Sequence, residues 1–132
     1  MPFDWTEFLT FAKALESDPN SPGPPEAALR SAASRAYYAA FHEALKFARS
    51  EGYDPMPTGD DHRRLREYFR DHQSNDKRRR RIATELGRCW DQRRRADYDV
   101  RLRKEPVSLA GHAIGMARSV LKELDSLREA SL

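Results

Sequence analysis

The residues best suited to chemistry lie in one short segment, where three arginines at 93–95 run through Ala96 into an Asp-Tyr-Asp triplet at 97–99. If a helix continues through the segment, each arginine faces an acceptor one turn later, because side chains four residues apart share a helix face. Arginines attract phosphate groups and can stabilise negative charge that develops on them. The alternative is a helix end that satisfies its own charges. Exposed ion pairs contribute only ~0–1 kcal/mol, which does not by itself account for such clustering.

These arginines belong to a wider basic segment from Lys77 to Lys104, which holds twelve basic residues against four acids. The rest of the chain is net acidic, so we expect a basic lobe on an acidic body. Such a lobe attracts nucleic acid, mainly without sequence preference. The candidate phosphate-binding residues are Arg78, Arg79, Arg80, Arg81, Arg94 and Arg95. A solvated arginine-rich face, or a docking patch for an acidic partner, is the alternative.

The composition predicts an all-α fold. The chain has 132 residues, of which 34% are charged and 39% hydrophobic. Many Ala, Leu, Arg and Glu residues with few β-branched ones favour helices over sheet. This length suits one hydrophobic core but not two. We therefore expect residues 1–132 to form a single helical domain.

Hydrophobic periodicity predicts five helices that position the candidate residues. The first is expected from about Trp5 to Glu16, after a capping box at 4–7, and the second from Pro25 up to a stop at Gly52. The alanine-rich face of the second helix suits the centre of a bundle. Loops rich in proline and glycine are expected at 17–25 and 53–59. A short polar third helix is predicted to begin at residues 60–61. A fourth helix is expected to be capped at 74–76 and to bury Ile82, Leu86, Cys89 and Trp90. The last helix is expected to be capped by Ser108.

The sequence shows no segment of the length and apolarity that a membrane span needs, and its N-terminus lacks the pattern of a secretory signal. The single cysteine, Cys89, falls within a helical apolar pattern, so we expect it to be buried in a reducing compartment. No group of histidines and cysteines has the spacing of a metal site. The prediction is a cytoplasmic protein without membrane span, disulfide, metal or cofactor.

Two segments together resemble the HEPN family, helical-bundle domains named for higher-eukaryote and prokaryote nucleotide binding. One is Ser-Arg-Ala-Tyr-Tyr-Ala-Ala-Phe-His at 34–42, and the other is Arg-x-x-Ala-Asp-Tyr-Asp at 93–99. The chain resembles in particular short stand-alone prokaryotic members, over nearly its whole length. This resemblance implies a four- to five-helix up-and-down bundle, commonly a homodimer, often encoded beside a minimal nucleotidyltransferase or within a toxin–antitoxin or defence module. Many relatives are metal-independent ribonucleases with a composite site at the dimer interface.

The chain departs from the active nucleases of that family, in which a histidine follows the arginine after four to six residues. Here Tyr98 stands at that spacing, and the next histidine is His112. Metal-independent RNA cleavage needs a base and a cation. Arg93 could supply the cation, whereas Tyr98 (ordinary pKa about 10) and Asp97 (about 3.9) are weak bases at neutral pH. In relatives paired with a nucleotidyltransferase a tyrosine near this motif can be nucleotidylated, and Tyr98 is the candidate here.

Arg35 and His42 form a second arginine–histidine pair at a similar spacing. Seven residues are about two helical turns, or ~10 Å, which is too far for one phosphate without a second subunit. The alternative for His42 is a partly buried histidine bonded to a neighbouring helix. Of the adjacent tyrosines, Tyr37 is expected in the core and Tyr38 towards Arg93. His62 and His72 are expected to face solvent on the polar third helix, and Trp5 and Trp90 are expected to be structural.

Two functions of different class follow. The first is a HEPN-type dimer that binds or cleaves RNA through Arg93, Asp97 and Tyr98, with the arginines at 78–81 and 94–95 holding phosphates. The second is a catalytically silent HEPN module that binds a nucleotide or docks a nucleotidyltransferase partner. A helical adaptor with no role in nucleic-acid binding is a third interpretation.

Overall fold

Five α-helices make up most of the part of the chain that the computed structural model describes, which is residues 2–20, 24–55 and 59–131. The helices are α1 (Thr6–Ser17), α2 (Pro25–Ser50), α3 (Asp61–Arg70), α4 (Lys77–Tyr98) and α5 (Pro106–Ala130). These ranges contain no strand. The all-α prediction is therefore confirmed. Two of the predicted loops include residues 21–23 and 56–58, which lie outside the described residues.

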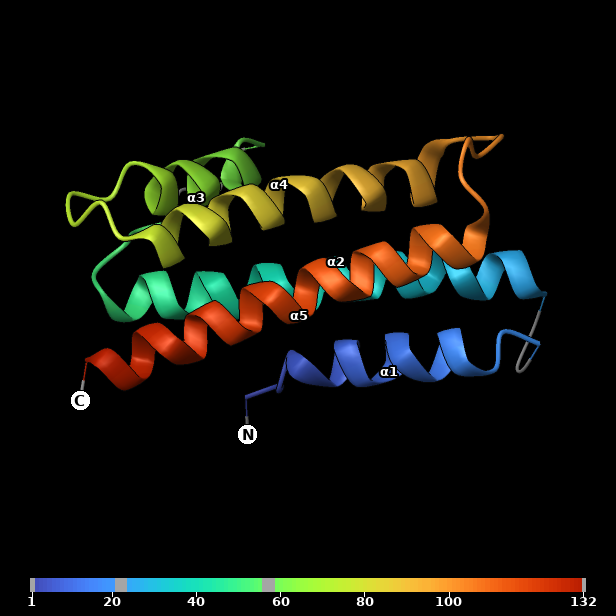
Figure 1. Cartoon of the computed structure of the whole chain (residues 1–132), viewed down its shortest axis with the longest axis horizontal. Coiled ribbons are helices and arrows are strands. Elements are labelled where there is room, and N and C mark those ends of the chain that lie inside the picture. Colours follow the sequence, from blue (N-terminus) through green and yellow to red (C-terminus); the bar gives the residue numbers. More distant parts are fainter. Residues whose placement is uncertain (1, 21–23, 56–58, 132) are drawn as a thin grey trace.

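The central helix α2 packs against all four other helices (Figure 1). Figure 1 shows α1, α2, α4 and α5 side by side with alternating chain direction, so α2 and α5 run parallel to each other. The short helix α3 lies beside the first half of α4 and runs in the same direction as α2. The up-and-down arrangement therefore holds for the four long helices, and α3 interrupts it.

The small residues of α2 allow this close packing. Its buried face is formed mainly by alanines, and seven of them have no exposed surface: Ala32, Ala33, Ala36, Ala39, Ala40, Ala44 and Ala48. Larger side chains of the other helices fill the space that these methyl groups leave, including Leu65, Phe69, Ile82, Leu86 and Leu124. Cys89 is buried among them, as expected, and burial raises the pKa of its thiol to about 12.

Local signals set most helix ends. Gly52 ends α2 with a φ of 99°, and the Tyr53 N–H donates to the Ala48 carbonyl at 3.0 Å, as in a Schellman motif. The Asp76 carboxylate caps α4 by accepting the Arg78 N–H at 2.8 Å. Both ends agree with the sequence-based expectation.

Two predicted caps are wrong. Ser108 does not cap α5, because that helix already begins at Pro106, whose ring fixes φ at a helical value and has no N–H to satisfy. At the first helix, the residue at the N-cap is Trp5, and the preceding Asp4 accepts the Thr6 N–H at 3.0 Å. The aspartate thus forms a local turn before α1 instead of the predicted capping box.

One polar cluster ties three helices together at the end of the bundle where α2 ends and α4 begins. Arg79, which is 6% exposed, donates two hydrogen bonds to the Glu51 carboxylate. Tyr68 of α3 donates to the same carboxylate at 2.7 Å. The hydrogen bonds from Arg79 lower the pKa of Glu51, although its partial burial acts in the opposite direction. The cluster is therefore a charged anchor between α2, α3 and α4.

No helix in the described ranges combines the length and apolarity needed to cross a membrane.

Candidate functional site

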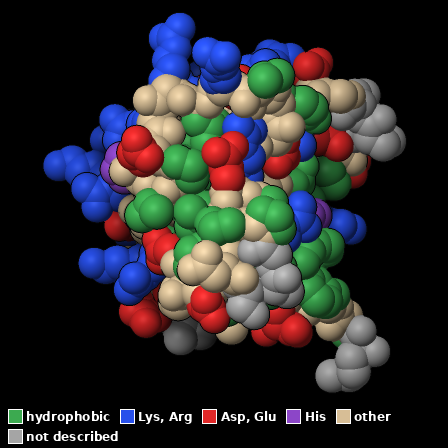
Figure 2. All heavy atoms as spheres, turned by 90° about the vertical axis from the view of Figure 1, so that its right-hand side faces the viewer, with side chains coloured by type: hydrophobic (Ala, Val, Ile, Leu, Met, Phe, Trp, Pro, Cys, Tyr) green, Lys and Arg blue, Asp and Glu red, His purple; other side chains and the backbone are tan. Residues whose placement is uncertain are grey.

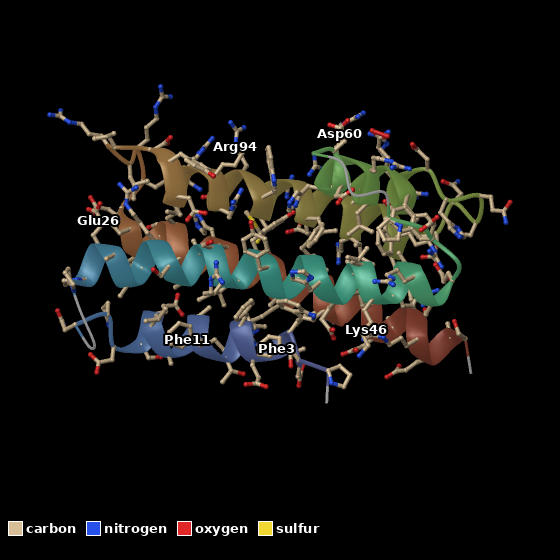
Figure 3. All side chains as sticks on the ribbon, turned by 180° about the vertical axis from the view of Figure 1, so that it is seen from behind. Phe3, Phe11, Glu26, Lys46, Asp60 and Arg94 are labelled. Carbon is tan, nitrogen blue, oxygen red and sulfur yellow. The ribbon has the colours of Figure 1, made fainter. Side chains whose placement is uncertain are left out.

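Arg30 of α2 holds the last turn of α4 in place. Its guanidinium donates to the carbonyl oxygens of Ala96 at 3.1 Å and Asp99 at 2.5 Å, and it also pairs with Glu26 at 3.0 Å. Carbonyls at a helix C-terminus lack partners within the helix, and a cation there also complements the helix dipole. Figure 3 shows Glu26 at the start of α2, at the same end of the bundle as the end of α4. This contact holds residues 96–99, which include the candidate residues Asp97 and Tyr98, against α2.

Arg93 lies at the centre of the candidate site and is only 17% exposed. Its Nε is 3.0 Å from Asp97 Oδ2, and its guanidinium carbon is 5.3 Å from the centre of the Tyr38 ring and 5.7 Å from that of Tyr98. The Nε–H is nevertheless poorly aligned with the carboxylate, so it is buried with no hydrogen-bond partner among the described residues. Arg93 and Asp97 therefore attract each other as charges without satisfying this donor.

The two segments singled out in the sequence meet here. Asp97 Oδ2 accepts from the Ser34 hydroxyl at 3.3 Å, and the Arg35 guanidinium donates to the same hydroxyl at 3.4 Å. Arg35 also lies over the Tyr38 ring at 5.3 Å. The expectation that Tyr38 points towards Arg93 is thus confirmed. Side chains of α2 and α4 form one site with two arginines, one carboxylate and two tyrosine rings.

Only one of the three predicted i,i+4 pairs in residues 93–99 forms as expected, namely Arg93 with Asp97. Arg95 instead pairs backwards with Asp91 at 3.1 Å. The cause is that α4 ends at Tyr98, and Asp99 has an extended backbone (ψ 123°) that takes its side chain off the helix face. Arg94 lies over the ring of Trp90 at 4.7 Å, so it too faces the preceding turn.

The outer edge of the site is open to solvent. Tyr98 is 70% exposed, and the connection that follows it carries exposed Val100, Arg101 and Arg103. Figure 2 faces this end of the bundle and shows Lys and Arg side chains projecting from its upper edge, where the connection from α4 to α5 lies. An anionic ligand approaching Tyr98 would meet these positive charges first.

His62 does not face solvent, contrary to the expectation for the third helix. Its ring lies 4.4 Å from that of Phe41 and its Nδ1 is 2.5 Å from the Tyr37 hydroxyl. Burial, followed by the charge of Arg93, lowers the pKa of His62. The short helix α3 thus turns this histidine inwards, onto the face of α2 that carries the tyrosines.

The partner of His62 determines what its ring can do. Tyr37 is 1% exposed, as expected for a core residue, and burial raises the pKa of its hydroxyl, which therefore keeps its proton. Because that hydroxyl has no other acceptor in the described chain, it donates to Nδ1 of His62. The neutral imidazole then carries its hydrogen on Nε2. In this state His62 has no free lone pair with which to accept a proton.

His42 is engaged with the first helix. Its ring stacks on that of Trp5 with centroids 3.6 Å apart, and burial lowers the pKa of His42. Arg35, in contrast, points to the candidate site. The arginine and histidine of the second sequence pair therefore lie in different surroundings. His42 is partly buried, as the alternative expected, but within the described residues it contacts the neighbouring segment by stacking on Trp5 and not by the expected hydrogen bond.

The arginines at 78–81 lie near the opposite end of α4, roughly 20 Å from Arg93 for a helix that rises ~1.5 Å per residue. Each contacts other groups of the chain: Arg78 pairs with Asp76 at 2.7 Å, Arg79 with Glu51, Arg80 with the Asn75 carbonyl at 2.6 Å, and Arg81 with Glu123 at 3.5 Å. The expected single basic lobe is thus spread along α4. Because Arg79 is buried in the Glu51 cluster, we leave it out of the candidate surface.

Sequence reasoning missed Arg30 and placed His62 wrongly in solvent. Both act across long separations, Arg30 on residues 96 and 99 and His62 on residue 37. Neither lies in a motif, so no local pattern marks it. A basic residue that faces a helix end, or a histidine on the inner side of a short helix, becomes visible only once the helices are placed in space.

No group of three or more His, Cys, Asp or Glu side chains in the described ranges is arranged to hold a metal ion. No family model matches the sequence, and no curated protein or solved structure matches the chain. The geometry of the Arg93 site is therefore the basis for assigning a function.

Proposed function

We propose that the chain is a HEPN-like helical protein that binds RNA or nucleotide phosphates through Arg93, Asp97 and Tyr98. The observation that carries this proposal is the state of Arg93, whose guanidinium lies near two tyrosine rings and whose Nε–H is buried without a hydrogen-bond partner in the described chain. A buried donor of this kind gains when an oxygen of a ligand, or a small movement of Asp97, satisfies it. The contact between residues 34–38 and 93–98 adds support, because these segments carry the resemblance to the HEPN family.

In this proposal Asp97 sets the position of Arg93, and Ser34 and Arg30 in turn hold Asp97 and the helix end. The exposed phenol of Tyr98 can donate a hydrogen bond to a phosphate oxygen or stack against a base. Arg94, Arg101 and Arg103 are exposed at the same end of α4 and supply further positive charge. Binding would accordingly be driven by charge and depend strongly on salt.

Cleavage of RNA is the less favoured form of this function. A ribonuclease of this kind needs a group that removes a proton from the 2′-hydroxyl. The neutral form of His62 has no free lone pair, because its Nδ1 accepts from the Tyr37 hydroxyl, and Asp97 is already engaged by Arg93 and Ser34. The geometry therefore supports phosphate binding better than catalysis. An active enzyme would be a metal-independent endoribonuclease.

A second candidate function is a catalytically silent HEPN-like module that docks a minimal nucleotidyltransferase, with Tyr98 as the acceptor of the transferred nucleotide. The observation that favours it is the 70% exposure of Tyr98 beside a buried arginine, because a partner enzyme can reach this phenol. By the same resemblance, the protein would act in the cytoplasm as a homodimer within a toxin–antitoxin or defence module.

The test is incubation of the purified protein with a mixed RNA pool, with and without a chelator, for wild type, Arg93→Ala and Arg118→Ala. Arg118 is exposed on α5 in a groove against α1, so its loss changes the net charge equally on another face. We expect wild type and Arg118→Ala to bind the RNA and Arg93→Ala to lose this binding. None of the three proteins is expected to cleave the RNA. Chelator-resistant fragments ending in 2′,3′-cyclic phosphate, absent with Arg93→Ala, would instead identify a ribonuclease. Equal retention by both variants, or none by wild type, would overturn the proposal.

A further inference from the structure

A groove between α3 and α4 lies one helical turn from the Arg93 site. It is an open groove of about 490 Å³, lined by Arg66, Arg70, Ala83, Thr84, Gly87, Arg88, Trp90 and Asp91. Three of these side chains are arginines and one is a partly buried tryptophan. A positively charged groove with an aromatic ring is the usual arrangement for binding single-stranded nucleic acid.

Trp90 is contacted by arginines from both helices. The guanidinium carbon of Arg66 is 5.3 Å from its ring centre, and that of Arg94 is 4.7 Å away. Trp90 was expected to be structural, but its partial exposure leaves the ring accessible from the groove. Figure 3 shows Arg94 on α4 pointing away from the bundle, on the side opposite α2. The ring therefore connects the groove to the arginines at the end of α4.

The charges in the groove are unequally compensated. Arg70 pairs with Asp71 at 2.9 Å, Arg88 with Glu85 at 3.4 Å, and the one acid in the described lining, Asp91, with Arg95 at 3.1 Å. Within the described chain, Arg66 and Arg94 pair with no carboxylate, and Nη1 of Arg66 is buried without a hydrogen-bond partner. Two guanidinium groups next to one aromatic ring are thus available for an anion.

Arg66 and Arg94 differ in how firmly they are held. The side chain of Arg66 lies over the bare backbone of Gly87, where an added Cβ would meet its Cδ at 3.4 Å. Arg94 is exposed, and within the described chain its guanidinium contacts the Trp90 ring without forming an ion pair. A stacked base is worth at least as much as an exposed cation–π contact. An incoming base can therefore displace Arg94 from the ring, and the released guanidinium can bind the adjoining phosphate.

We infer that this groove binds one unpaired nucleotide of a single-stranded RNA, with the base stacked on Trp90 and the phosphate held by Arg66 and Arg94. The inference rests on the proposed function, because the strand would continue from Arg94 around α4 to Arg93, which lies on the face of the same helix turned towards Tyr38 of α2. Unpaired RNA is required because a base within a duplex does not expose its face to a protein side chain. The groove thus makes the protein selective for single strands.

The test follows the fluorescence of Trp90 in the Trp5→Phe background, in which it is the remaining tryptophan, and measures the affinity of every variant by the anisotropy of labelled RNA, because Trp90→Leu leaves no tryptophan to follow. The probes are a short single-stranded RNA and a duplex of the same length, and the variants are Trp90→Leu, Arg66→Ala, Arg93→Ala and Arg118→Ala. We expect the single strand to quench Trp90, and we expect Trp90→Leu and Arg66→Ala to weaken its binding at least about five-fold, with little effect on the duplex. Arg118→Ala should behave as the parent, and circular dichroism checks that each variant is folded.

The outcomes separate this inference from the proposed function. Unquenched Trp90 and unchanged affinity in Trp90→Leu and Arg66→Ala, with binding still lost in Arg93→Ala, would overturn the groove assignment and leave the Arg93 site intact. An equal loss of single-stranded and duplex binding in Arg66→Ala would also overturn it, because the groove would then supply charge alone. Absence of RNA binding by the parent protein would overturn both.

Discussion

At the scale of single residues, Arg93 combines three conditions that a surface ion pair does not have. It is largely buried, its pairing with Asp97 leaves one donor unsatisfied, and tyrosine rings lie beside its guanidinium. Exposed ion pairs such as Arg63 with Glu67 are common and weak. The site is therefore better explained by a ligand for Arg93 than by a contribution of the Arg93–Asp97 pair to folding.

The role of Asp97 gives a prediction. In Asp97→Asn the side chain keeps its shape and its oxygen can still accept from Ser34, but the negative charge next to Arg93 is lost. We expect affinity for single-stranded RNA to rise about two- to five-fold, since a partly exposed charge contact is worth up to ~1 kcal/mol. Fluorescence anisotropy with labelled RNA measures this. Asp125→Asn, on an exposed part of α5, is the matched control. A loss of affinity would show that the charge of Asp97, and not only its shape, is needed to position Arg93.

At the scale of elements, the candidate site depends on how α4 ends. The last turn of this helix is held by Arg30, which reaches the carbonyls of residues 96 and 99 from the neighbouring helix α2. Without this contact the terminal carbonyls would have water as their partner, and a helix end fraying by one turn would move residues 95–98. The geometry of Asp97 and Tyr98 is thus set by a residue more than sixty positions away in the sequence.

Replacement of Arg30 should loosen this end selectively. In Arg30→Met the aliphatic part of the side chain is kept while the hydrogen bonds to the α4 carbonyls are lost, at a cost of about 1–2 kcal/mol. Hydrogen exchange should become faster for amides near residues 96–99 and stay unchanged in the middle of α4. RNA affinity should fall together with this protection. Lys46→Met, exposed on the same helix, provides the comparison, and equal exchange in the two variants would contradict the role given to Arg30.

The helices could be predicted from the sequence more completely than the site. Gly52, Asp76 and Pro25 act on their own neighbours, so short-range rules place these ends correctly. Ser108 was misplaced because Pro106 competes for the same helix start. Arg95 was assigned to Asp99 because the pairing rule assumes a continuing helix, whereas α4 stops one residue earlier. Packing between helices brings Arg30, His62 and Arg66 to the site or its groove. No local sequence pattern predicts this packing.

At the scale of the whole molecule, the two ends of the bundle differ in how far their charged groups are paired. At one end Arg79, Glu51 and Tyr68 link α4, α2 and α3 through buried and partly buried charge. At the other end Arg93, Tyr98 and the exposed basic connection present unsatisfied or accessible groups. The arginines of α4 thus divide into a structural set near its start and a candidate ligand-binding set near its end. Net charge alone does not separate these sets.

The structural set gives a prediction about stability. In Glu51→Gln the charge of Arg79 stays buried without a carboxylate, so the free energy of unfolding should fall by about 2–4 kcal/mol. Glu67→Gln, which removes an exposed i,i+4 partner of Arg63, should change it by less than about 0.5 kcal/mol. Urea unfolding at neutral pH measures both. Similar values for the two variants would contradict the assignment.

The same pair predicts a dependence on pH. Folding lowers the pKa of Glu51 from its ordinary value of 4.5, so its contribution to stability is complete above that pH and is lost as the pH falls through the lower folded value. The difference in the free energy of unfolding between wild type and Glu51→Gln should therefore keep its neutral-pH value from about pH 6 to 8. It should become smaller below about pH 4. A difference that stays constant down to pH 3 would exclude this linkage.

The most direct test of the central claim is the salt dependence of RNA binding. The affinity of wild type, Arg93→Ala and Arg118→Ala for one single-stranded RNA would be measured by anisotropy over a range of salt concentrations. A phosphate contact to single-stranded RNA contributes about 0.7 to the slope of log affinity against log salt. We predict a steep slope for wild type and Arg118→Ala and a slope lower by about this amount for Arg93→Ala. A flat slope for wild type, or the same slope in both variants, would contradict phosphate binding at Arg93.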